Sequence, residues 1–410
     1  MNTLEKQALQ YHSAGQRGKL AIQVTKPVAT QADLALAYSP GVAVPCVEIN
    51  KDPAKAYEYT AKGNLVGVIT NGTAVLGLGD IGALAGKPVM EGKAVLFKKF
   101  AGIDSFDIEI DETDPEKLVE IVAALHPTFG GINLEDIKAP ECFYVERRLR
   151  ERLSIPVFHD DQHGTAIVVG AGFLNAVQLT GRDVSKVKVV CSGAGAAAMA
   201  CLDMLIDLGV RRENVYVCDS RGVLTTEREL TEEKRAWAQA TSARTLSDVI
   251  GMADVFLGVS GPGLLKQEDV QKMAAKPIVF TLANPEPELR PELVREVAPD
   301  AIIATGRSDY PNQINNALCF PYLFRAALDS AATTINQAMK RACVVALAAM
   351  ARDDEQFGKE YIVPTLLDKR LLTGVTPLIA TAAFESGVAR RQLNEQEYRV
   401  QLEALAKTLL

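Results

Sequence analysis

The chain has 410 residues, of which 48% are hydrophobic and 23% are charged, and its formal net charge is −7. These are globular proportions, long enough for two or three domains, and they exclude a disordered or membrane-embedded chain. An acidic protein gains nothing from the phosphate field of nucleic acids, so the charge also argues against nucleic-acid binding.

The cysteines indicate a reducing environment. There are seven, they are scattered without a CxxC pair, and several lie in apolar runs. This usage is typical of buried thiols in a cytoplasmic protein and not of a disulfide framework or a zinc site. Residues 1–19 lack the apolar core of a signal peptide, and no run of about 18 apolar residues occurs. We therefore expect a soluble, cytoplasmic protein.

The first 160 residues mix helical and strand-like segments, and we take residues 1–160 as an α/β domain. Short helical patches before residue 60 alternate with turn-rich segments at 25–30 and 38–45. The strand-like segments are 65–70, 106–111 and 155–160, and the helical patterns are 115–125 and 139–153.

After an apolar helix pattern at 164–180, the rhythm changes to short apolar strands that alternate with helices. The strand-like segments are 187–192, 215–220, 254–260, 277–283 and 301–306. Strands that are apolar throughout are typical of a parallel sheet covered by helices on both faces. The predicted fold class is therefore α/β, with a Rossmann-type, doubly wound parallel sheet at 161–330. A helical segment at 331–410, with proline breaks near 364 and 377, completes the chain.

A dinucleotide-binding fingerprint begins the second domain. The first strand is followed by Gly193-x-Gly195-x-x-Ala198, a helix and a second strand that ends at Asp219. Gly193 permits the tight turn, and Gly195 lets the backbone approach a pyrophosphate. Ala198 keeps helix and strand close. The N–H groups at the helix start, around Ala196, would bind the phosphates. The alternative is a glycine turn that binds nothing.

The residues after the second strand bear on the choice of cofactor. Asp219 suits the ribose 2′-hydroxyl of NAD, whereas Ser220 and Arg221 suit the 2′-phosphate of NADP. The two signals conflict, and we favour NADP. Arg221 could equally be a solvated surface charge.

A second match, Gly77-x-Gly79-x-x-Gly82, also follows a strand. The next residues, 83–92, contain three further helix breakers where a helix should begin. We interpret this match as a loop of the first domain that binds no nucleotide.

Two acidic clusters follow strand-like segments and predict a metal site. They contain Glu135 and Asp136 in the first case and Asp160 and Asp161 in the second. A hard cation such as Mg²⁺ or Mn²⁺ prefers several oxygen ligands. Helix capping by Asp136 or Asp161 is the alternative. A zinc site at the i, i+4 pair His159 and His163 is a further alternative, which Gly164 and the preceding strand disfavour because they argue against a helix there.

Two further residues are candidate proton carriers. Lys93 opens an apolar stretch after a glycine, and a lysine in a dry cleft can act as a base. Tyr38 precedes Ser-Pro-Gly on a turn and could donate a proton, or merely pack.

At these segments the sequence resembles the malic enzymes, and the bacterial NADP-dependent branch in particular. The resemblance runs from about residue 15 to beyond 380. It rests on AYSPGVA, NGTAVLGLGDIG, GKPVMEGKAVLFK, GGINLEDI, VFHDDQHGTA, SGAGAAA, ANPEPE and GRSDYPNQINNALCFP. It implies oxidative decarboxylation of L-malate to pyruvate and CO2 with reduction of NADP or NAD, in a homodimer or higher homo-oligomer.

The resemblance also implies residue roles. Glu135, Asp136 and Asp161 would bind Mg²⁺ or Mn²⁺, and Lys93, held by Asp160, would be the general base. Tyr38 would be the acid that protonates carbon 3. Asn284 and Asn315 would contact the substrate carboxylate or the nicotinamide ribose. Larger eukaryotic members carry a malate-binding arginine at the position that is Ala74 here, so another group must neutralise that carboxylate.

Two other functions fit parts of the pattern. A malolactic or oxaloacetate-decarboxylating enzyme without net redox change would use the same lysine and carboxylates. A nucleotide-binding regulatory protein would be favoured if Lys93, Tyr38 or the acidic residues were missing, and all are present.

Overall fold

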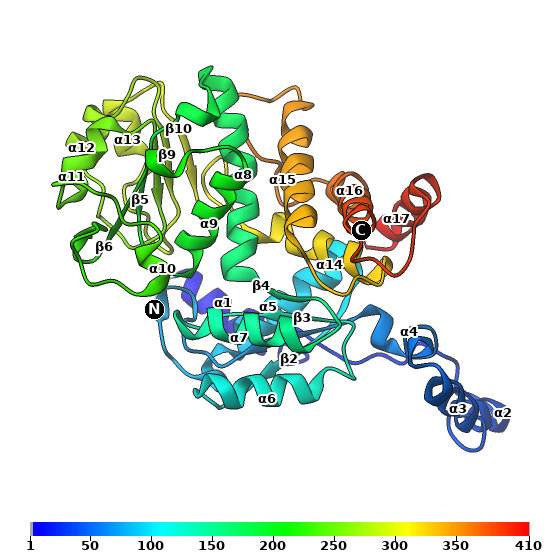
Figure 1. Cartoon of the computed structure of the whole chain (residues 1–410). Helices are drawn as coiled ribbons and strands as arrows, with labels where there is room; N and C mark the ends of the chain where they lie inside the picture. Colours follow the sequence, from blue (N-terminus) through cyan, green and yellow to red (C-terminus); the bar gives the residue numbers. More distant parts are fainter. Residues whose placement is uncertain (1–2, 410) are drawn as a thin grey trace.

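The computed structural model describes residues 3–409, apart from the side chain of Leu76, and contains two sheets (Figure 1). Residues 1, 2 and 410, at the ends of the predicted domains, lie outside this range. The predicted α/β fold class is confirmed. The domain boundaries after residues 160 and 330 stay a prediction.

The first sheet has four parallel strands in the order β2-β1-β3-β4. They are β1 (Leu65–Thr70), β2 (Asp104–Glu109), β3 (Gly131–Leu134) and β4 (Val157–His159). Its helices are α5 (Ala83–Ala101), α6 (Pro115–Leu125) and α7 (Glu141–Arg152). Helices α6 and α7 pack on one face, where Leu118, Val122 and Leu149 join Ile69 and Ile132 in a buried cluster. Helix α5 covers the other face through Met90 and Phe97, which pack with Val66 and Val68.

The second sheet has six strands in the order β10-β9-β8-β5-β6-β7, and all are parallel except β7. The strands are β5 (Val189–Ser192), β6 (Val215–Asp219), β7 (Gly222–Val223), β8 (Val255–Gly258), β9 (Ile278–Thr281) and β10 (Ile302–Thr305). Helices α8 (Asp160–Thr180) and α9 (Ala196–Asp207) cover one face. The other face packs on α11 (Leu246–Val249), α12 (Gln267–Lys272) and α13 (Pro291–Val297), and α10 (Glu232–Arg235) lies after β7.

The predicted helical C-terminal part folds back onto the rest of the chain. It contains α14 (Phe320–Asp329), α15 (Gln337–Arg352), α16 (Leu371–Glu385) and α17 (Glu395–Leu409). Figure 1 shows α8 between the second sheet and α15. One continuous buried cluster joins residues of both sheets, α8 and these helices. Among residues 3–409, no helix combines the length and the hydropathy needed to cross a membrane. All seven cysteines are free.

Three predictions about local structure were wrong. Helix α5 begins at Ala83, directly after the glycine loop, although Gly86 and Pro88 lie in its first two turns. Helix α8 begins at Asp160, four residues earlier than predicted. Gly164 does not interrupt it but is required inside it, because a side chain at this position would collide with Asp160 and Asn316.

The third concerns Pro377, which does not break α16. Proline has no N–H to bond the carbonyl four residues earlier. That carbonyl, of Thr373, accepts a hydrogen bond from Arg399 Nη1 of α17 at 3.0 Å instead. The loop that contains Pro364 does interrupt the helices, between α15 and α16.

The N-terminal helices lie at the surface. Helix α1 (Thr3–Ser13) has no buried residue, and neither do α2 (Gln31–Ala37), α3 (Ala43–Lys51) and α4 (Ala56–Tyr59). In Figure 1, α2 and α3 project from the body beyond α4.

We predict that Asn175 fixes the position of α8. Its side chain is fully buried, and Nδ2 donates to the carbonyls of Ala348 and Ile362 at 3.0 and 2.8 Å. Asn175→Ala should lower the free energy of unfolding by about 2–4 kcal/mol, because buried carbonyls lose their partner and a cavity forms. Urea unfolding followed by circular dichroism measures this. Gln178→Ala, at an exposed position of the same helix, is the control. A loss below about 1 kcal/mol for Asn175→Ala would contradict the prediction.

Candidate active site

The acidic residues predicted to bind metal meet at one edge of the first sheet. β1, β3 and β4 are parallel neighbours, so their carboxyl ends lie together. Glu135 and Asp136 directly follow β3, and Asp160 and Asp161 form the first turn of α8 directly after β4. Two segments that are 25 residues apart in sequence thus present their carboxylates to the same space.

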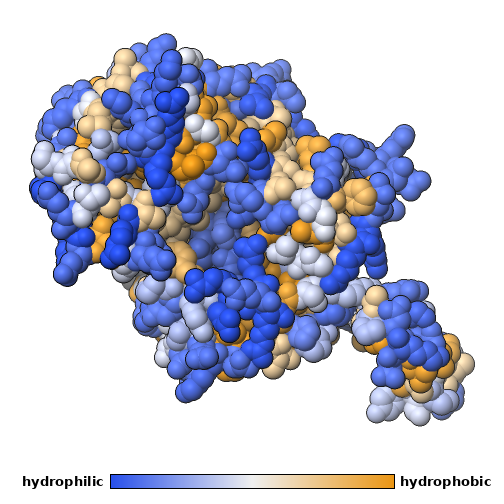
Figure 2. Space-filling model, in the orientation of Figure 1, coloured by the Kyte–Doolittle hydropathy of each residue, from blue (hydrophilic) through white to orange (hydrophobic). Residues whose placement is uncertain are grey.

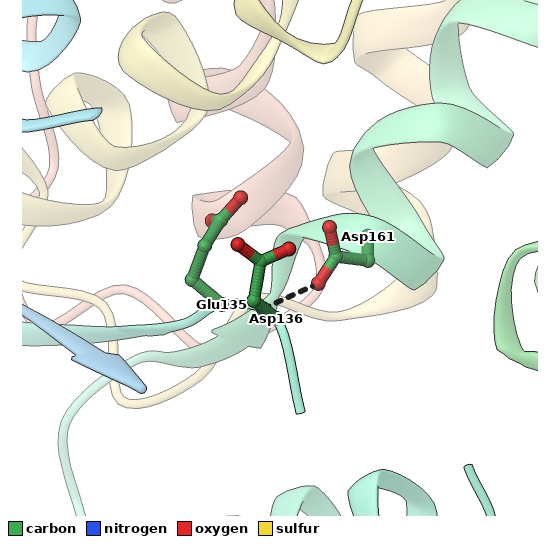
Figure 3. Close-up of side chains that lie close together, drawn as sticks. All are labelled: Glu135, Asp136 and Asp161. Carbon is green, nitrogen blue, oxygen red and sulfur yellow. Dashed lines mark hydrogen bonds between the residues drawn. The ribbon is translucent and has the colours of Figure 1, made fainter. Parts of the chain in front are cut away.

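Three of these carboxylates form a compact cluster (Figure 3). Glu135, Asp136 and Asp161 each offer an oxygen, and these atoms lie within 4.8 Å of one another. The backbone N–H of Asp136 donates to Asp161 Oδ2 at 2.8 Å, and Asn133 Nδ2 donates to Glu135 Oε2 at 2.8 Å. Asp136 has a φ of 53°, a left-handed conformation that costs free energy and is concentrated at functional sites.

The two alternatives for these residues are not supported. Neither Asp136 nor Asp161 caps a helix: α7 has Pro140 at its N-cap, and α8 has His159. His163 Nε2 lies 2.8 and 2.9 Å from the two carboxylate oxygens of Glu146, so the histidine pair is not a zinc site. Within residues 3–409, the only group of three or more potential ligands is the carboxylate cluster.

Lys93, the candidate base, contacts this cluster. It lies in the middle of α5, 7% exposed, with Nζ 2.6 Å from Asp160 Oδ2 and 2.9 Å from Glu135 Oε1. The ammonium also lies over the ring of Phe320, 4.4 Å from its centroid. Burial alone lowers the pKa of Lys93, but the negative charges of Asp160 and Glu135 outweigh burial and raise the pKa above its ordinary value.

The charges of the cluster fit a divalent cation. Burial raises the pKa of Glu135 to about 7 and that of Asp161 to about 6. The charge of Asp161 adds to the rise in the pKa of Glu135, and the charge of Asp160 adds to that in the pKa of Asp161. Several buried carboxylates are thus partnered by one ammonium, Lys93. A hard cation with oxygen ligands is the group that this donor set fits, because it supplies the missing positive charge.

The dinucleotide fingerprint has the predicted geometry. Gly193 has a φ of 125°, and a Cβ there would lie 2.6 Å from the carbonyl oxygen of Val259. Gly195 is the N-cap of α9, which starts at Ala196, and a Cβ on Gly195 would meet nothing within 4 Å. Ala198 is fully buried between helix and sheet. A cavity of about 450 Å³ opens here, with Gly193, Gly195, Asp219, Ser220 and Lys234 in its lining.

Asp219 at this cavity is already partnered. Arg228 Nη2 lies 2.9 Å from both of its oxygens, Lys234 Nζ lies 3.1 Å from Oδ2, and the N–H of Arg221 donates to Oδ1. Burial raises the pKa of Asp219, but these donors outweigh burial and hold it below the ordinary value. One carboxylate between two side-chain cations leaves this corner of the cavity with a positive charge. The side chain of Arg221 is exposed.

Of the other residues singled out in the sequence, only Ala74 is in direct contact with the carboxylate cluster through a hydrogen bond that the structure shows. Ala74 is next to it, since its N–H donates to the carbonyl of Asp136 at 3.0 Å. Asn284 is exposed on the loop after β9, and its carbonyl would touch a Cβ on Gly77, so the glycine loop of the first sheet packs against the second. Asn315 is half-buried, and its Oδ1 caps the backbone N–H of Ala317.

Tyr38 is not brought into the cluster of its own chain. It lies at the end of α2, and its side chain is 75% exposed. Figure 1 shows α2 and α3 on the projecting part of the molecule, away from β3, β4 and the start of α8.

Several partners of the site residues could not be predicted from the sequence. Lys234 and Arg228 at Asp219, Glu146 at His163, and Phe320 under Lys93 were not predicted. None of these residues belongs to a local motif. Only the folded chain brings each to its partner.

The fold and the site define a two-sheet α/β protein with a dinucleotide-type cavity at the second sheet and a buried lysine with a carboxylate cluster at the first. Comparisons with known proteins agree. Residues 17–150 match the family model "Malic enzyme, N-terminal domain", and residues 162–382 match "Malic enzyme, NAD binding domain". The chain belongs to the malic enzyme family.

Individual relatives extend over nearly the whole chain. The NADP-dependent malic enzyme of Escherichia coli is 60% identical over 95% of this chain, which spans 54% of that relative's length. The bifunctional malic/malolactic enzyme of Bacillus subtilis is 50% identical over 96% of this chain and 97% of its own. The crystal structure of the Pyrococcus horikoshii malic enzyme superposes with a TM-score of 0.91 at 42% identity, covering 99% of each chain. The chain thus spans about half the length of the first curated relatives it matches.

We predict that cation binding at the cluster weakens in acid. A carboxyl group must lose its proton to bind metal, and the pKa values of about 7 for Glu135 and 6 for Asp161 mean that both groups take up protons below neutrality. The Kd for Mn²⁺ should rise at least about tenfold between pH 7.5 and 5.5. The increase in Tm caused by Mn²⁺ should shrink over the same range. Calorimetric titration and thermal melting measure these effects.

Asp161→Asn is the control for this experiment, because it removes a carboxylate and keeps its shape. The variant should bind Mn²⁺ weakly at both pH values. Wild-type affinity that stays constant from pH 7.5 to 5.5 would show that protons do not compete at this cluster.

Proposed function

We propose that the chain catalyses the oxidative decarboxylation of L-malate to pyruvate and CO2, with reduction of NADP and with dependence on a divalent cation. The observation that carries this proposal is the position of Lys93, whose ammonium contacts Glu135 of the carboxylate cluster on one side and Asp160 on the other. The proposed base and the proposed cation ligands thus share one buried space, in a chain that also holds a dinucleotide-type cavity. We also propose that the reaction takes place in the cytoplasm, where seven free thiols stay reduced.

The proposed roles follow from these contacts. Glu135, Asp136 and Asp161 would hold the cation, which would polarise the substrate oxygens and compensate the negative charge of the cluster, and the nicotinamide would supply the hydride acceptor. Lys93 must be neutral to take the proton of the 2-hydroxyl group. The negative charges of Glu135 and Asp160 stabilise its ammonium form. A cation that compensated the charge of Glu135 would remove part of this stabilisation, and the pKa of Lys93 would fall towards the range of a base.

Asp160 is proposed as a positioning residue. It is fully buried and holds Nζ of Lys93 at 2.6 Å, which fixes the lysine in one orientation. After CO2 leaves, carbon 3 of the enol needs a proton, for which we propose Tyr38. Asn284, on the loop after β9, and Asn315, which caps the turn at Ala317, are proposed to contact the substrate carboxylate or the nicotinamide ribose.

For the cofactor, the charge around Asp219 supports NADP over NAD. With Arg228 and Lys234 on its carboxylate, Asp219 does not oppose a 2′-phosphate, and Lys234 lines the cavity. The name of the Escherichia coli relative agrees with this choice.

The name of the Bacillus subtilis relative favours a second candidate, the direct conversion of malate to lactate and CO2. One assay separates the two candidates: L-malate and Mn²⁺ are incubated with NADP or NAD, absorbance is read at 340 nm, and pyruvate and lactate are quantified. Reduced cofactor and pyruvate in equal amounts support oxidative decarboxylation. Lactate without net reduction of the cofactor supports the second candidate, and the formation of neither pyruvate nor lactate excludes both candidates.

We predict that Lys93→Ala lowers kcat at least about a hundredfold, because a positioned base contributes this much. The matched control is Lys98→Ala on the same helix, where the exposed ammonium pairs with Asp104, and its kcat should stay within about twofold of wild type. Steady-state kinetics and a thermal melt of each variant provide the measurement. A Lys93→Ala enzyme with more than a tenth of wild-type kcat would remove Lys93 as the base.

We predict that Lys234→Gln raises the Kd for NADP at least about tenfold and changes that for NAD less than about threefold, because the lost charge lies beside Asp219, where the two cofactors would differ. Arg221→Ala, whose side chain is exposed, should weaken NADP over NAD by a smaller factor. Fluorescence titration with each reduced cofactor measures both constants. Equal losses for the two cofactors in Lys234→Gln would contradict the assignment.

A further inference from the structure

Glu288, on the loop after β9, is a buried carboxylate that the proposed function does not use. Its side chain is fully buried. Burial raises the pKa of Glu288, and hydrogen bonds from Ser260 and Ala283 offset only part of that rise. A buried carboxyl group is costly unless its hydrogen bonds are satisfied, so the groups that satisfy it show what it holds in place.

The contacts of Glu288 join the ends of two neighbouring strands. The backbone N–H of Ser260 donates to Oε1 at 2.9 Å, and the Ser260 hydroxyl donates to the same oxygen at 3.4 Å. The N–H of Ala283 donates to Oε2 at 3.2 Å. Gly258 leaves the space for the carboxylate, because a Cβ there would lie 2.5 Å from Cδ of Glu288. One side chain thus ties the loop after β8 to the loop after β9.

Ser260 is also part of the dinucleotide-type cavity. Its Oγ lies 3.0 Å from Oγ of Ser192, the last residue of β5, and both serines line the cavity of about 450 Å³. Ser260 is exposed, whereas Ser192 is buried. A hydroxyl that is held by a carboxylate and by a second hydroxyl has a fixed direction, and its remaining lone pair can accept a hydrogen bond from a ligand.

The strand order indicates which part of a dinucleotide Ser260 faces. From β5 the chain continues to β6 on one side and later to β8 on the other, and a dinucleotide spans the crevice at such a switch point. Asp219, at the end of β6, marks the adenosine half. The ends of β8 and β9, with Ser260 and Asn284, therefore face the nicotinamide half. Figure 2 shows that the molecule is hollowed between the part with the second sheet and the part with the first.

We propose that Glu288 is a positioning residue for the nicotinamide half of the cofactor, because it fixes Ser260, whose hydroxyl binds a hydroxyl group of the nicotinamide ribose. Ala283 anchors the second carboxylate oxygen, which keeps the carboxylate turned towards Ser260. The inference rests on the proposed function, since it takes NADP as the cofactor.

The test compares the binding of two ligands in the absence of malate. NADPH occupies both halves of the cofactor site, whereas adenosine 2′,5′-bisphosphate occupies only the adenosine half. Glu288→Gln should raise the Kd for NADPH about tenfold, because an amide accepts from only one of the N–H groups of Ser260 and Ala283 and turns a donor towards the other. The Kd for adenosine 2′,5′-bisphosphate should stay within about twofold, because its half of the site is distant. Fluorescence and calorimetric titrations measure these constants.

Glu286→Gln is the matched control. Glu286 lies on the same loop, but its side chain is half-exposed and pairs with Arg290 at 2.9 Å. Both Kd values should stay within about twofold of wild type, because exposed ion pairs contribute little. A Glu288→Gln variant that loses affinity for both ligands alike has a generally loosened domain, and that result would overturn the proposal.

Ser260→Ala tests the contact itself at an exposed position, where the fold should survive. It should raise the Kd for NADPH about fivefold and leave that for adenosine 2′,5′-bisphosphate unchanged. Combined with Glu288→Gln, it should raise the Kd for NADPH no more than about twofold beyond the larger single effect, because both substitutions act on one contact. An unchanged Kd for NADPH in Ser260→Ala, or single effects that simply multiply, would overturn the proposal.

These titrations separate the inference from the proposed function. A wild-type chain that binds NADPH but does not oxidise malate would refute the proposed function, while the Kd values would still decide the role of Glu288. A folded wild-type chain that binds adenosine 2′,5′-bisphosphate and NADPH with equal affinity gains nothing from the nicotinamide half, and this result would also overturn the inference. A thermal melt of each variant verifies the fold.

Discussion

The active site depends on burying several carboxylates around one ammonium. Removing charges from water is costly, and the cost is recovered only when the geometry and the pairing are good. The contacts of Lys93 with Asp160 and Glu135 supply part of that pairing, and a divalent cation on the cluster would supply the rest. Because Glu135 belongs to both groups, a change in cation occupancy changes the field at Lys93. The proposed base and the proposed metal site are therefore one electrostatic unit.

Helix α8 brings this unit into contact with the cofactor domain. Its first turn supplies Asp160 and Asp161, and its buried face packs against α9, which begins at the fingerprint glycine. The contact of Gly77 with the carbonyl of Asn284 adds a second connection between the two sheets. One continuous core therefore holds the carboxylate cluster and the fingerprint turn, and packing sets the separation of the proposed substrate and cofactor sites.

The sequence predicted most of what depends on local pattern. The apolar strands and the fingerprint from Gly193 to Ala198 could be predicted because each is a pattern of residues close together in the sequence. The grouping of the acidic residues could be predicted because parallel strands align their carboxyl ends. The starts of α5 and α8 and the continuity of α16 were mispredicted, since Gly164 and Pro377 are accommodated by distant partners, Asn316 and Arg399. Tyr38 shows the same limit, because sequence motifs do not say how far apart their residues lie in the folded chain.

The cofactor corner gives the clearest case of a motif whose meaning depends on distant residues. An acid at the end of the second strand ordinarily favours NAD, because its free oxygens accept the ribose hydroxyl and repel a phosphate. Here both oxygens of Asp219 are already occupied by Arg228 and Lys234, which lie 9 and 15 residues further along the chain. Their two positive charges exceed its single negative charge, so the repulsion disappears and a net attraction for phosphate remains. The same aspartate therefore supports the opposite cofactor once its partners are known.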